Sequence, residues 1–445
     1  MRRLRIVGFT LVSLAACGSA EEPGSSGNGG PGGSVGNAGG SAGSAPGGAG
    51  GAMGGAGGAL GGAGGAGGAM GGASGAAGSA SGAAGDAGSG GAGGAVGGSG
   101  GTGGAAGSAG TAGSAGSGGS AGAANEFFVG PNGNDSNPGT RQAPFKTIGK
   151  GQAVAVAGTT IWLLAGTHAY NMPVLLVKSG ANNNLIKLFA DAGARPLVDF
   201  AQQARGQSAN RGIEIRGDYW HMKGLEVRRA ADNGILIAGS HNIVEDVIVH
   251  DNDDTGIQIL VSESMATDNT RGAYNQVINC DSYENYDALT NGENADGFAA
   301  KLRIGAGNVF RGCRAWNNVD DGWDLFAADD VVVIENCWSF LNGSTSRGSG
   351  PSGDGNGFKL GGRPAGVGQG DAPHQARNNS AFENESCGFT RNNNTQTPVL
   401  SQCGVGDNGN DYCDLSCSND YTVSITGARA KTIARNADGS LPSTR

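Results

Sequence analysis

The chain has 445 residues, 90 of them glycine, and a formal net charge of −9 at neutral pH. This acidity argues against nucleic acid as a partner, and it suits an acidic polymer only if a divalent cation bridges the two. Most of the glycine lies before residue 125, which favours one folded domain over the two or three that the length suggests.

The first 17 residues have the form of an export signal. Met1-Arg-Arg-Leu-Arg is basic, an apolar run follows to Leu14, and Leu14-Ala-Ala-Cys17 resembles a bacterial lipoprotein box whose Cys17 receives the lipid. The alternative is an ordinary signal cleaved near Ala16 or Ala20. We therefore expect a protein that is secreted or anchored by lipid in the outer membrane, since no later stretch has the ~18 apolar residues of a membrane span.

Residues 18–124 are almost wholly glycine, alanine and serine, with no aromatic residue. Such a segment cannot bury enough apolar surface to offset its ordering entropy, so it predicts a disordered, flexible linker. A silk-like structure is the competing interpretation. The folded domain should then span 125–445.

The domain opens with elements typical of a capped solenoid. A strand near Phe127 and a turn-rich loop precede residues 144–156, whose apolar side chains at Phe145, Ile148, Ala153 and Val156 suit a short amphipathic helix. A second strand is expected at 160–164. This opening resembles the N-terminal cap of right-handed parallel β-helix proteins that act on polysaccharides.

Two phrases repeat through the rest of the domain. A glycine followed by apolar-x-apolar recurs with spacings of 22, 41, 25 and 35 residues, at Gly234, Gly256, Gly297, Gly322 and Gly357. A base of ~22 residues with insertions predicts an all-β solenoid, a parallel β-helix, because loops lengthen without disturbing stacked strands. A β-propeller would repeat at ~40 to 45 residues.

The second phrase predicts stacked turns. Its four copies align an asparagine ladder, an aromatic stack and a cysteine column: Asn285, Asn318, Asn342 and Asn384; Tyr283, Trp316, Phe340 and Phe382; Cys280, Cys313 and Cys337. We expect these cysteines to be buried thiols, with a disulfide between two of them as the alternative. Cys387, Cys403, Cys413 and Cys417 are close enough in sequence for two disulfides in any of three pairings.

Aligning the glycine-led phrases brings polar residues together. An aromatic residue follows the glycine in the last three copies, as expected for a strand with one buried and one solvated face. The residue after the aromatic one is Asp324 in the copy at Gly322 and Lys359 in the copy at Gly357. Asp296 and Asp321 precede their glycines, with Asp320 beside them. The loops of 11 and 14 residues that precede Gly297 and Gly357 could wall a groove along this face.

Several carboxylates this close cannot all ionise without compensation, and oxygen-only ligands suit Ca²⁺. The alternative is a set of aspartates that form turns, as Asp232, Asp253 and Asp254 are expected to do. Lys359 would be either a salt-bridge partner or, beside a cation that disfavours its ammonium form, a general base. Lys301 is the second candidate, although we expect it farther along its strand from the aspartates.

Here the sequence resembles a known family. The phrases Asn294-Ala-Asp-Gly-Phe-Ala-Ala-Lys301, Asp320-Asp-Gly-Trp-Asp-Leu-Phe326 and Gly357-Phe-Lys359 resemble the family 9 polysaccharide lyases, pectate lyases of right-handed β-helix fold. The resemblance implies that Asp296, Asp320, Asp321 and Asp324 bind Ca²⁺ and that Lys359 is the base for β-elimination of polygalacturonate. Lys301 and Arg391 would contact the substrate.

Two other functions remain open at this point. A glycoside hydrolase of the same fold would use the carboxylates as acid and base, and a non-catalytic polysaccharide-binding β-helix would need no Lys359. In each case we expect a monomer at the cell surface or outside the cell, with an acidic polysaccharide as partner.

Overall fold

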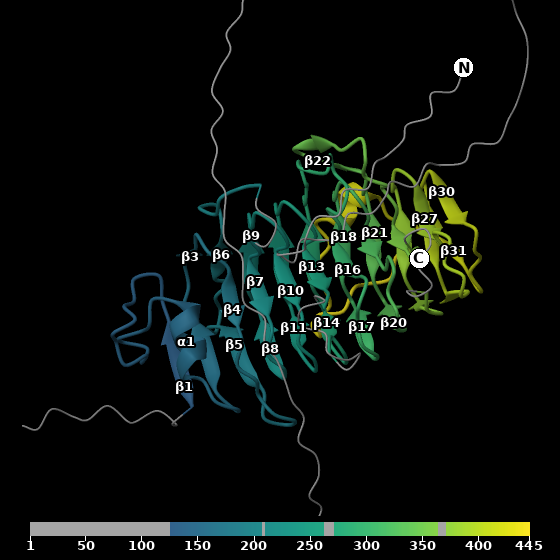
Figure 1. The fold of residues 1–445 in the computed structure, drawn as a ribbon. Coiled ribbons are helices and arrows are strands. Elements are labelled where there is room, and N and C mark those ends of the chain that lie inside the picture. The colour runs from purple at the N-terminus through teal and green to yellow at the C-terminus, as the bar shows by residue number, and fades with distance from the viewer. Residues whose placement is uncertain (1–124, 207–209, 262–270, 364–370) are drawn as a thin grey trace, which may run out of the picture. The chain divides into compact units, whose positions relative to one another are not determined.

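The computed structural model describes residues 125–206, 210–261, 271–363 and 371–445. The expected signal peptide with Cys17 and the expected linker at 18–124 lie outside these residues and stay predictions. In the described part, each full coil gives one strand to each of three parallel sheets, and neighbouring coils pair throughout (Figure 1). The solenoid predicted from the repeat is confirmed.

Sheet C contains the glycine-led strands and carries the residues of the expected site. Its strands, in spatial order, are β4 (Val174–Leu176), β7 (Ile213–Ile215), β10 (Ile235–Ile237), β13 (Ile257–Ile259), β16 (Phe298–Ala300), β19 (Trp323–Asp324), β24 (Phe358–Lys359), β27 (Cys387–Thr390) and β30 (Asn410–Cys413).

The chain runs from sheet C to sheet A and then to sheet B before it returns. Sheet A contains β1 (Glu126–Val129), β2 (Thr160–Leu163), β5 (Ile186–Ala190), β8 (Trp220–Lys223), β11 (Ile243–Glu245), β14 (Gln276–Ile278), β17 (Asn308–Arg311), β20 (Val332–Glu335), β25 (Gln375–Arg377) and β28 (Val399–Ser401). Sheet B contains β3 (Thr167–Ala169), β6 (Leu197–Asp199), β9 (Glu226–Arg228), β12 (Ile248–His250), β15 (Asp281–Tyr283), β18 (Arg314–Trp316), β21 (Trp338–Phe340), β26 (Ser380–Phe382), β29 (Gly404–Gly406) and β31 (Tyr421–Thr422).

The repeated glycine is explained by how closely the coils approach one another. A Cβ atom at Gly322 would lie 1.8 Å from the Ser339 hydroxyl and 2.7 Å from the Gly357 carbonyl oxygen, so any side chain would clash. The aromatic residue after each glycine points inward, and Phe298 and Phe358 stack on Trp323 with ring centroids 4.6 and 4.8 Å away. These contacts fix the coil-to-coil register in the region of the site.

The predicted asparagine ladder is present between sheets B and C. Asn318 Nδ2 donates to Asn342 Oδ1 at 3.0 Å, and Asn342 Nδ2 donates to Asn384 Oδ1 at 2.8 Å. A second ladder, which the sequence did not reveal, joins sheets C and A, where Asn275 N donates to Asn308 Oδ1 at 3.0 Å. Both ladders satisfy buried turn backbone that water cannot reach.

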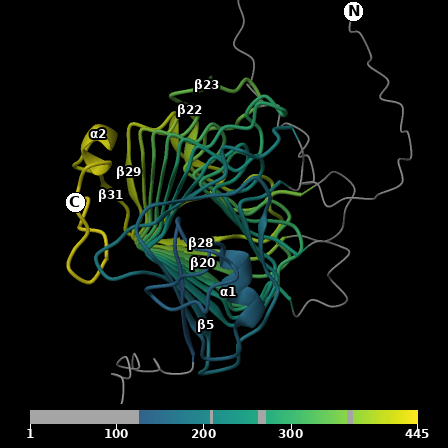
Figure 2. The same ribbon diagram turned by 90° about the vertical axis from the view of Figure 1, so that its left-hand side faces the viewer.

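The N-terminal end of the coil is capped, and the C-terminal segment packs on the outside of sheet B. Helix α1 (Ile148–Val154), capped by Thr147, lies across the N-terminal end (Figure 2) and is shorter than the predicted 144–156. Residues after Val423, with helix α2 (Gly427–Ala430), cover the aromatic stack of sheet B, whose predicted members pack together. Over the described residues, no helix has the length and hydropathy that crossing a membrane requires.

The cysteines behave as two groups, as expected. Cys280, Cys313 and Cys337 are buried thiols, so the alternative of a disulfide among them is not realised. The late cysteines form two bridges, Cys387–Cys413 and Cys403–Cys417, which is one of the three possible pairings. The first bridge joins β27 to β30 near the C-terminal end of sheet C.

A hairpin in the loop that precedes β24 completes the described strands. It consists of β22 (Ser344–Thr345) and β23 (Gly348–Ser349), which pair in antiparallel fashion.

Candidate active site

Sheet C places an acid and a base side by side. Asp324 in β19 is the register partner of Lys359 in β24, although 35 residues separate them in the sequence. The same column holds Leu236, Gln258 and Ala299 in the preceding strands and Thr390 in the next. The predicted adjacency of Asp324 and Lys359 is confirmed.

The aspartates gather around these two residues. One carboxylate oxygen from each of Asp296, Asp321 and Asp324 lies within 4.8 Å of the others, and Asp320, Asp321 and Asp354 form a second such group. All except Asp354 are at most 1% exposed. The four predicted aspartates thus form one buried cluster, which Asp321 links to Asp354.

Two lysines enter this cluster from opposite sides. Lys359 Nζ lies 3.2 Å from Asp354 Oδ2, 3.4 Å from Asp321 Oδ2 and 3.7 Å from Asp324 Oδ2. Lys301 Nζ lies 2.9 Å from Asp296 Oδ2 and 2.8 Å from Asp324 Oδ2. The expectation that Lys301 lies farther from the aspartates was wrong, because its long side chain folds back over the strand.

The face of sheet C was also expected to be solvated at the variable position, and that expectation was wrong. Asp324 is 0% and Lys359 2% exposed. The Lys359 ammonium lies 5.9 Å from the ring centroid of Phe326, which stands on the carboxyl side of the strands, while Asp354 closes the amino side. The charged groups therefore interact in a low-dielectric environment, where their mutual effects are large.

The two long loops lie beside each other at the amino edge of the strands, and the groove that they were expected to wall stays a prediction. They contact each other, since Ser352 N donates to the Asn291 carbonyl oxygen at 3.2 Å. The second loop also reaches the cluster, because Asp354 N donates to Asp320 Oδ1 at 2.7 Å and Asn356 Nδ2 donates to Asp321 Oδ1 at 2.9 Å.

Sequence reasoning missed both Asp354 and Asn356. Asn356 precedes Gly357 just as Asp321 precedes Gly322, so the alignment of the repeat contained a signal for it. Asp354 stands in an irregular insertion, where the repeat gives no register.

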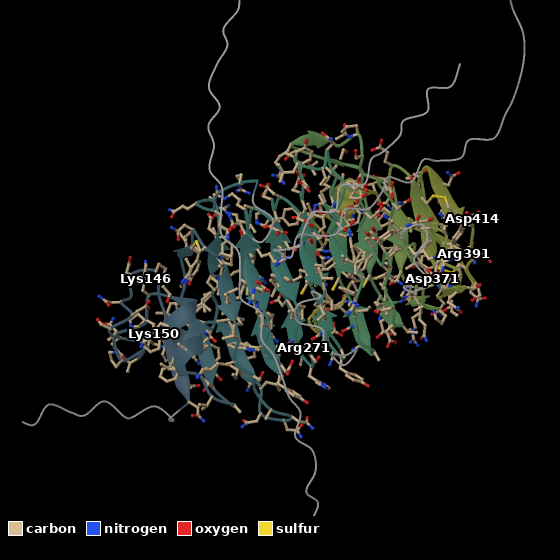
Figure 3. All side chains as sticks on the ribbon, in the orientation of Figure 1. Lys146, Lys150, Arg271, Asp371, Arg391 and Asp414 are labelled. Atoms are coloured by element: carbon tan, nitrogen blue, oxygen red, sulfur yellow. A yellow bond between two sulfur atoms is a disulfide. The ribbon has the colours of Figure 1, made fainter. Side chains whose placement is uncertain are left out.

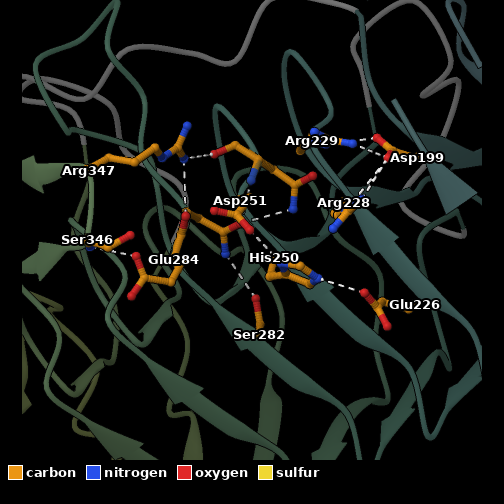
Figure 4. A network of polar contacts seen from close by, with 12 residues as sticks. Asp199, Glu226, Arg228, Arg229, His250, Asp251, Ser282, Glu284, Ser346 and Arg347 are labelled. Atoms are coloured by element: carbon orange, nitrogen blue, oxygen red, sulfur yellow. Dashed lines mark hydrogen bonds and ion pairs between the residues drawn. The ribbon is translucent and has the colours of Figure 1, made fainter. Parts of the chain in front are cut away.

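An arginine anchors the loop that carries Asp354. Arg347 donates to the carbonyl oxygens of Glu284 (Figure 4) and Asn252. It also pairs with Asp253, three coils away, at 3.1 Å. Ser346 N donates to the Glu284 carboxylate at 2.6 Å. The loop is therefore tied to earlier coils and does not depend on the aspartate cluster alone for its position.

Burial controls the titration of the aspartates. Burial, with repulsion from Asp320 as the next cause, raises the pKa of Asp321 well above its usual range. Burial and the Asp296 carboxylate do the same to the pKa of Asp320. The pKa of Asp296 is also raised by burial, although the Lys301 ammonium opposes the shift. Two ammonium groups do not compensate five carboxylates that have lost their hydration.

This donor set fits a hard divalent cation. Two oxygens on the same Ca²⁺ can stand up to about 5 Å apart, which covers the 4.8 Å spread of the cluster. Among the described residues, Asp321 Oδ2 accepts no hydrogen bond despite full burial. Its charged neighbour is Lys359 Nζ at 3.4 Å, so it lacks the hydrogen bond that buried polar atoms normally have, and a cation would provide a closer partner.

The side-chain contacts of Arg391 are with residues outside this cluster. It follows β27, and its guanidinium donates to the carbonyl oxygens of Asn394 and Thr395. Figure 3 labels it near the C-terminal end of the coil.

Comparison with known proteins identifies what the coil is similar to. The family described as "Pel9A-like, right handed beta helix region" matches residues 127–422. Pectate lyase L from Paenibacillus polymyxa (strain SC2) is 42% identical over 294 residues, which are 64% of this chain and 64% of that protein. The chain thus spans less than two thirds of this curated relative.

Solved structures give the same result for the fold. The crystal structure of pectate lyase Pel9A superposes with a TM-score of 0.62 at 33% identity, over 72% of this chain and 88% of that one. A rhamnogalacturonan lyase superposes with a TM-score of 0.58 at 24% identity over 72% of this chain and 95% of that one, which shows a shared fold.

Proposed function

Since the chain belongs to the Pel9A-like family of right-handed β-helices, we propose that it is a calcium-dependent pectate lyase that cleaves polygalacturonate by β-elimination. The observation that carries this proposal is a buried lysine beside a cluster of carboxylates that lack sufficient compensation. Two of the proteins that this chain is similar to, pectate lyase L and Pel9A, are pectate lyases, which supports the same reaction.

Asp296, Asp320, Asp321 and Asp324 would hold the cation. A calcium ion bound there would take up the C6 carboxylate of a galacturonate unit and withdraw charge from it, which acidifies the proton on C5. Asn356 orients one of these ligands, since both its backbone N–H and its Nδ2 donate to Asp321 Oδ1.

Lys359 is the proposed base. Three carboxylates surround its nitrogen and favour the ammonium form, so the amine becomes accessible once those carboxylates are committed to a cation. Lys359 Nζ then takes the C5 proton, the C5–H electron pair forms a double bond between C4 and C5, and the bond from C4 to the glycosidic oxygen breaks. The departing oxygen takes up one proton, which balances the proton removed from C5, so no water is consumed.

Lys301 and Arg391 are the proposed substrate-binding residues. Lys301 already contacts two of the proposed cation ligands, so it stands where a bound carboxylate would lie. Arg391 stands beyond β27 and would meet a neighbouring sugar. Export through the N-terminal segment, lipidation of Cys17 and a monomeric state stay proposals too.

Incubation with polygalacturonate distinguishes this function from its competitors. A lyase yields an unsaturated uronide, with a new ultraviolet absorbance and a mass one water below the hydrolysis product, and a chelator stops it. Saturated products that persist in chelator would indicate a hydrolase instead. Binding without any new chain ends would indicate a non-catalytic module.

A further inference from the structure

The two edges of sheet C differ in charge. Before the strands, on the amino edge, stand the aspartates of the site, preceded by Asp232 and Asp254 in earlier coils. The turns that lead from sheet C to sheet A contain a set of arginines that we call the arginine edge: Arg216, Arg271, Arg303, Arg363 and Arg391. The same turns also hold Asp218, Asp329, Asp330 and Asp371, of which Asp371 pairs with Arg363 at 3.6 Å. Figure 3 labels Arg271 toward the middle of the coil and Arg391 near its C-terminal end.

The arginine edge extends along much of the sheet. Arg216 follows β7 and Arg391 follows β27, and six strand steps separate these strands, or roughly 29 Å at the usual spacing of parallel strands. Arg271 Nη2 donates to the Arg216 carbonyl oxygen at 2.9 Å, so these two neighbours lie together. The row therefore runs past the aspartate cluster on both sides.

Arg216 reaches back over the sheet. Its Nε and Nη2 donate to the two carboxylate oxygens of Glu214 at 2.8 and 3.0 Å, and Glu214 occupies the register column that continues to Asp324. The Arg216 side chain remains 41% exposed. A guanidinium is thus oriented over the same face as the proposed reaction centre.

Arg303 lies closest to that centre along the chain. It follows Lys301 by two residues, after β16, which pairs directly with the strand of Asp324. Arg303 is exposed, and its side chain forms no hydrogen bond or ion pair with the other described residues. Its guanidinium can therefore bind a ligand without breaking a contact of the fold.

The charge of the centre explains why such an edge is needed. Asp296, Asp320, Asp321, Asp324 and Asp354 contribute five negative charges when ionised, which exceed by one the combined charge of two ammonium groups and a divalent cation, and by two once Lys359 is the neutral base. A polyuronate adds one carboxylate per sugar, and those that do not reach the cation would be repelled. Positive charge beside the centre has to offset that repulsion.

We propose that the arginine edge binds the carboxylates of the uronate units that flank the cleaved one, with Arg303 holding a unit next to the reaction centre. The inference rests on the proposed function, because it takes an anionic polysaccharide as the ligand. Guanidinium groups suit this role, since they form paired hydrogen bonds with carboxylates and stay charged at every working pH.

The test replaces Arg303 by alanine and by lysine in the full chain. Arg311→Ala is the matched control, because Arg311 is an exposed arginine on sheet A that pairs with Glu335. On polygalacturonate, we expect Arg303→Ala to raise KM about three- to fivefold with kcat within about twofold, as for loss of an exposed charge pair. Arg303→Lys should recover part of the loss, and the control should match the wild type.

Methyl esterification of the substrate provides a measurement that a purely structural role of Arg303 would not change. Esterification removes the carboxylate charges that Arg303 would bind. The KM on half-esterified polymer divided by the KM on unesterified polymer should therefore be smaller for Arg303→Ala than for the wild type. An unchanged KM and an unchanged ratio would overturn the proposal.

Failure of the proposed function is distinguishable from failure of the arginine edge. If the wild type makes no unsaturated product, affinity electrophoresis in gels containing polygalacturonate still applies. Arg303→Ala should then migrate faster than the wild type, and equal retardation would overturn the arginine edge independently of turnover.

Discussion

The ammonium group of Lys301 lies 2.8 Å from Oδ2 of Asp324 and 2.9 Å from Oδ2 of Asp296, although the three residues belong to two different coils. These are oxygens that the proposed calcium ion would use. Lys301 and the proposed ion would therefore compete for the same carboxylates, and we predict that cation binding displaces Lys301 toward the substrate.

Lys301→Met should consequently bind calcium more tightly. Removal of the ammonium leaves Asp296 and Asp324 without that partner, so we expect the calcium Kd to fall about tenfold while KM for polygalacturonate rises. Isothermal titration calorimetry and steady-state kinetics measure the two effects. Lys223→Met is the control, because Lys223 pairs with Glu245 on sheet A. A weaker calcium affinity in Lys301→Met would contradict the competition.

Asp321→Asn should raise the stability of the metal-free protein and reduce the stabilisation by calcium. The raised pKa of Asp321 means that the folded metal-free protein keeps a proton that the unfolded chain has lost. Stability of the metal-free protein therefore falls as pH rises above the ordinary aspartate range. At about pH 8, metal-free Asp321→Asn should melt higher than the metal-free wild type, yet gain less from added calcium. Differential scanning calorimetry with and without chelator measures both melting temperatures. If calcium raised the melting temperature of the variant as much as that of the wild type, Asp321 would not be a calcium ligand.

Asp254 offers a second pH test, outside the proposed cation ligands. Burial and repulsion from Asp232 raise the pKa of Asp254 to about 8. The folded state holds this proton well above the pH at which the unfolded chain releases it, so the stability it contributes is lost as pH rises toward 8. Asp254→Asn keeps an acceptor for Asn233 Nδ2. Its melting temperature should match the wild type at about pH 5 and exceed it by a few degrees at about pH 9. Equal melting temperatures at both pH values would contradict the assignment.

The asparagine ladder between sheets C and A should matter for stability and not for calcium. Asn275 is 0% exposed, accepts from Asn242 N at 3.0 Å and donates to Asn308 Oδ1. Asn275→Ala leaves buried turn groups without partners, at a cost of about 2–3 kcal/mol in the free energy of unfolding. Urea unfolding measures this, with exposed Asn436→Ala as the control. A loss below about 0.5 kcal/mol would mean that water replaces the ladder.

The sequence predicted the parts of the site that depend on register. Gly322 and Gly357 tolerate no side chain, and the stacked aromatic residues after them fix the strands, so alignment alone put Asp324 beside Lys359. The asparagine ladder was visible for the same reason. Asn275 and Asn308 were missed because they stand at the turns between sheets C and A. These turns vary in length, so the two asparagines do not align in the repeat.

Features that depend on side-chain reach or on insertions were not predictable. Lys301 stands two positions past Ala299 in its strand, and only the path of its flexible side chain brings the nitrogen to Asp324. The burial of Lys359 arises from Phe326 and from a loop without repeat, which also contributes Asp354. A pattern of stacked strands carries no information about how such a loop folds.

The central claim is that Lys359 is the base of a calcium-dependent elimination. Its most direct test is the rate at which the ultraviolet absorbance of an unsaturated uronide grows on polygalacturonate with calcium, for the wild type and for Lys359→Ala. Calcium binding is measured on the same samples. We expect rapid growth for the wild type and a loss of roughly a thousandfold in the variant, with calcium affinity retained. A wild type that produces no chromophore, or a variant that keeps more than about a tenth of the rate, would contradict the account.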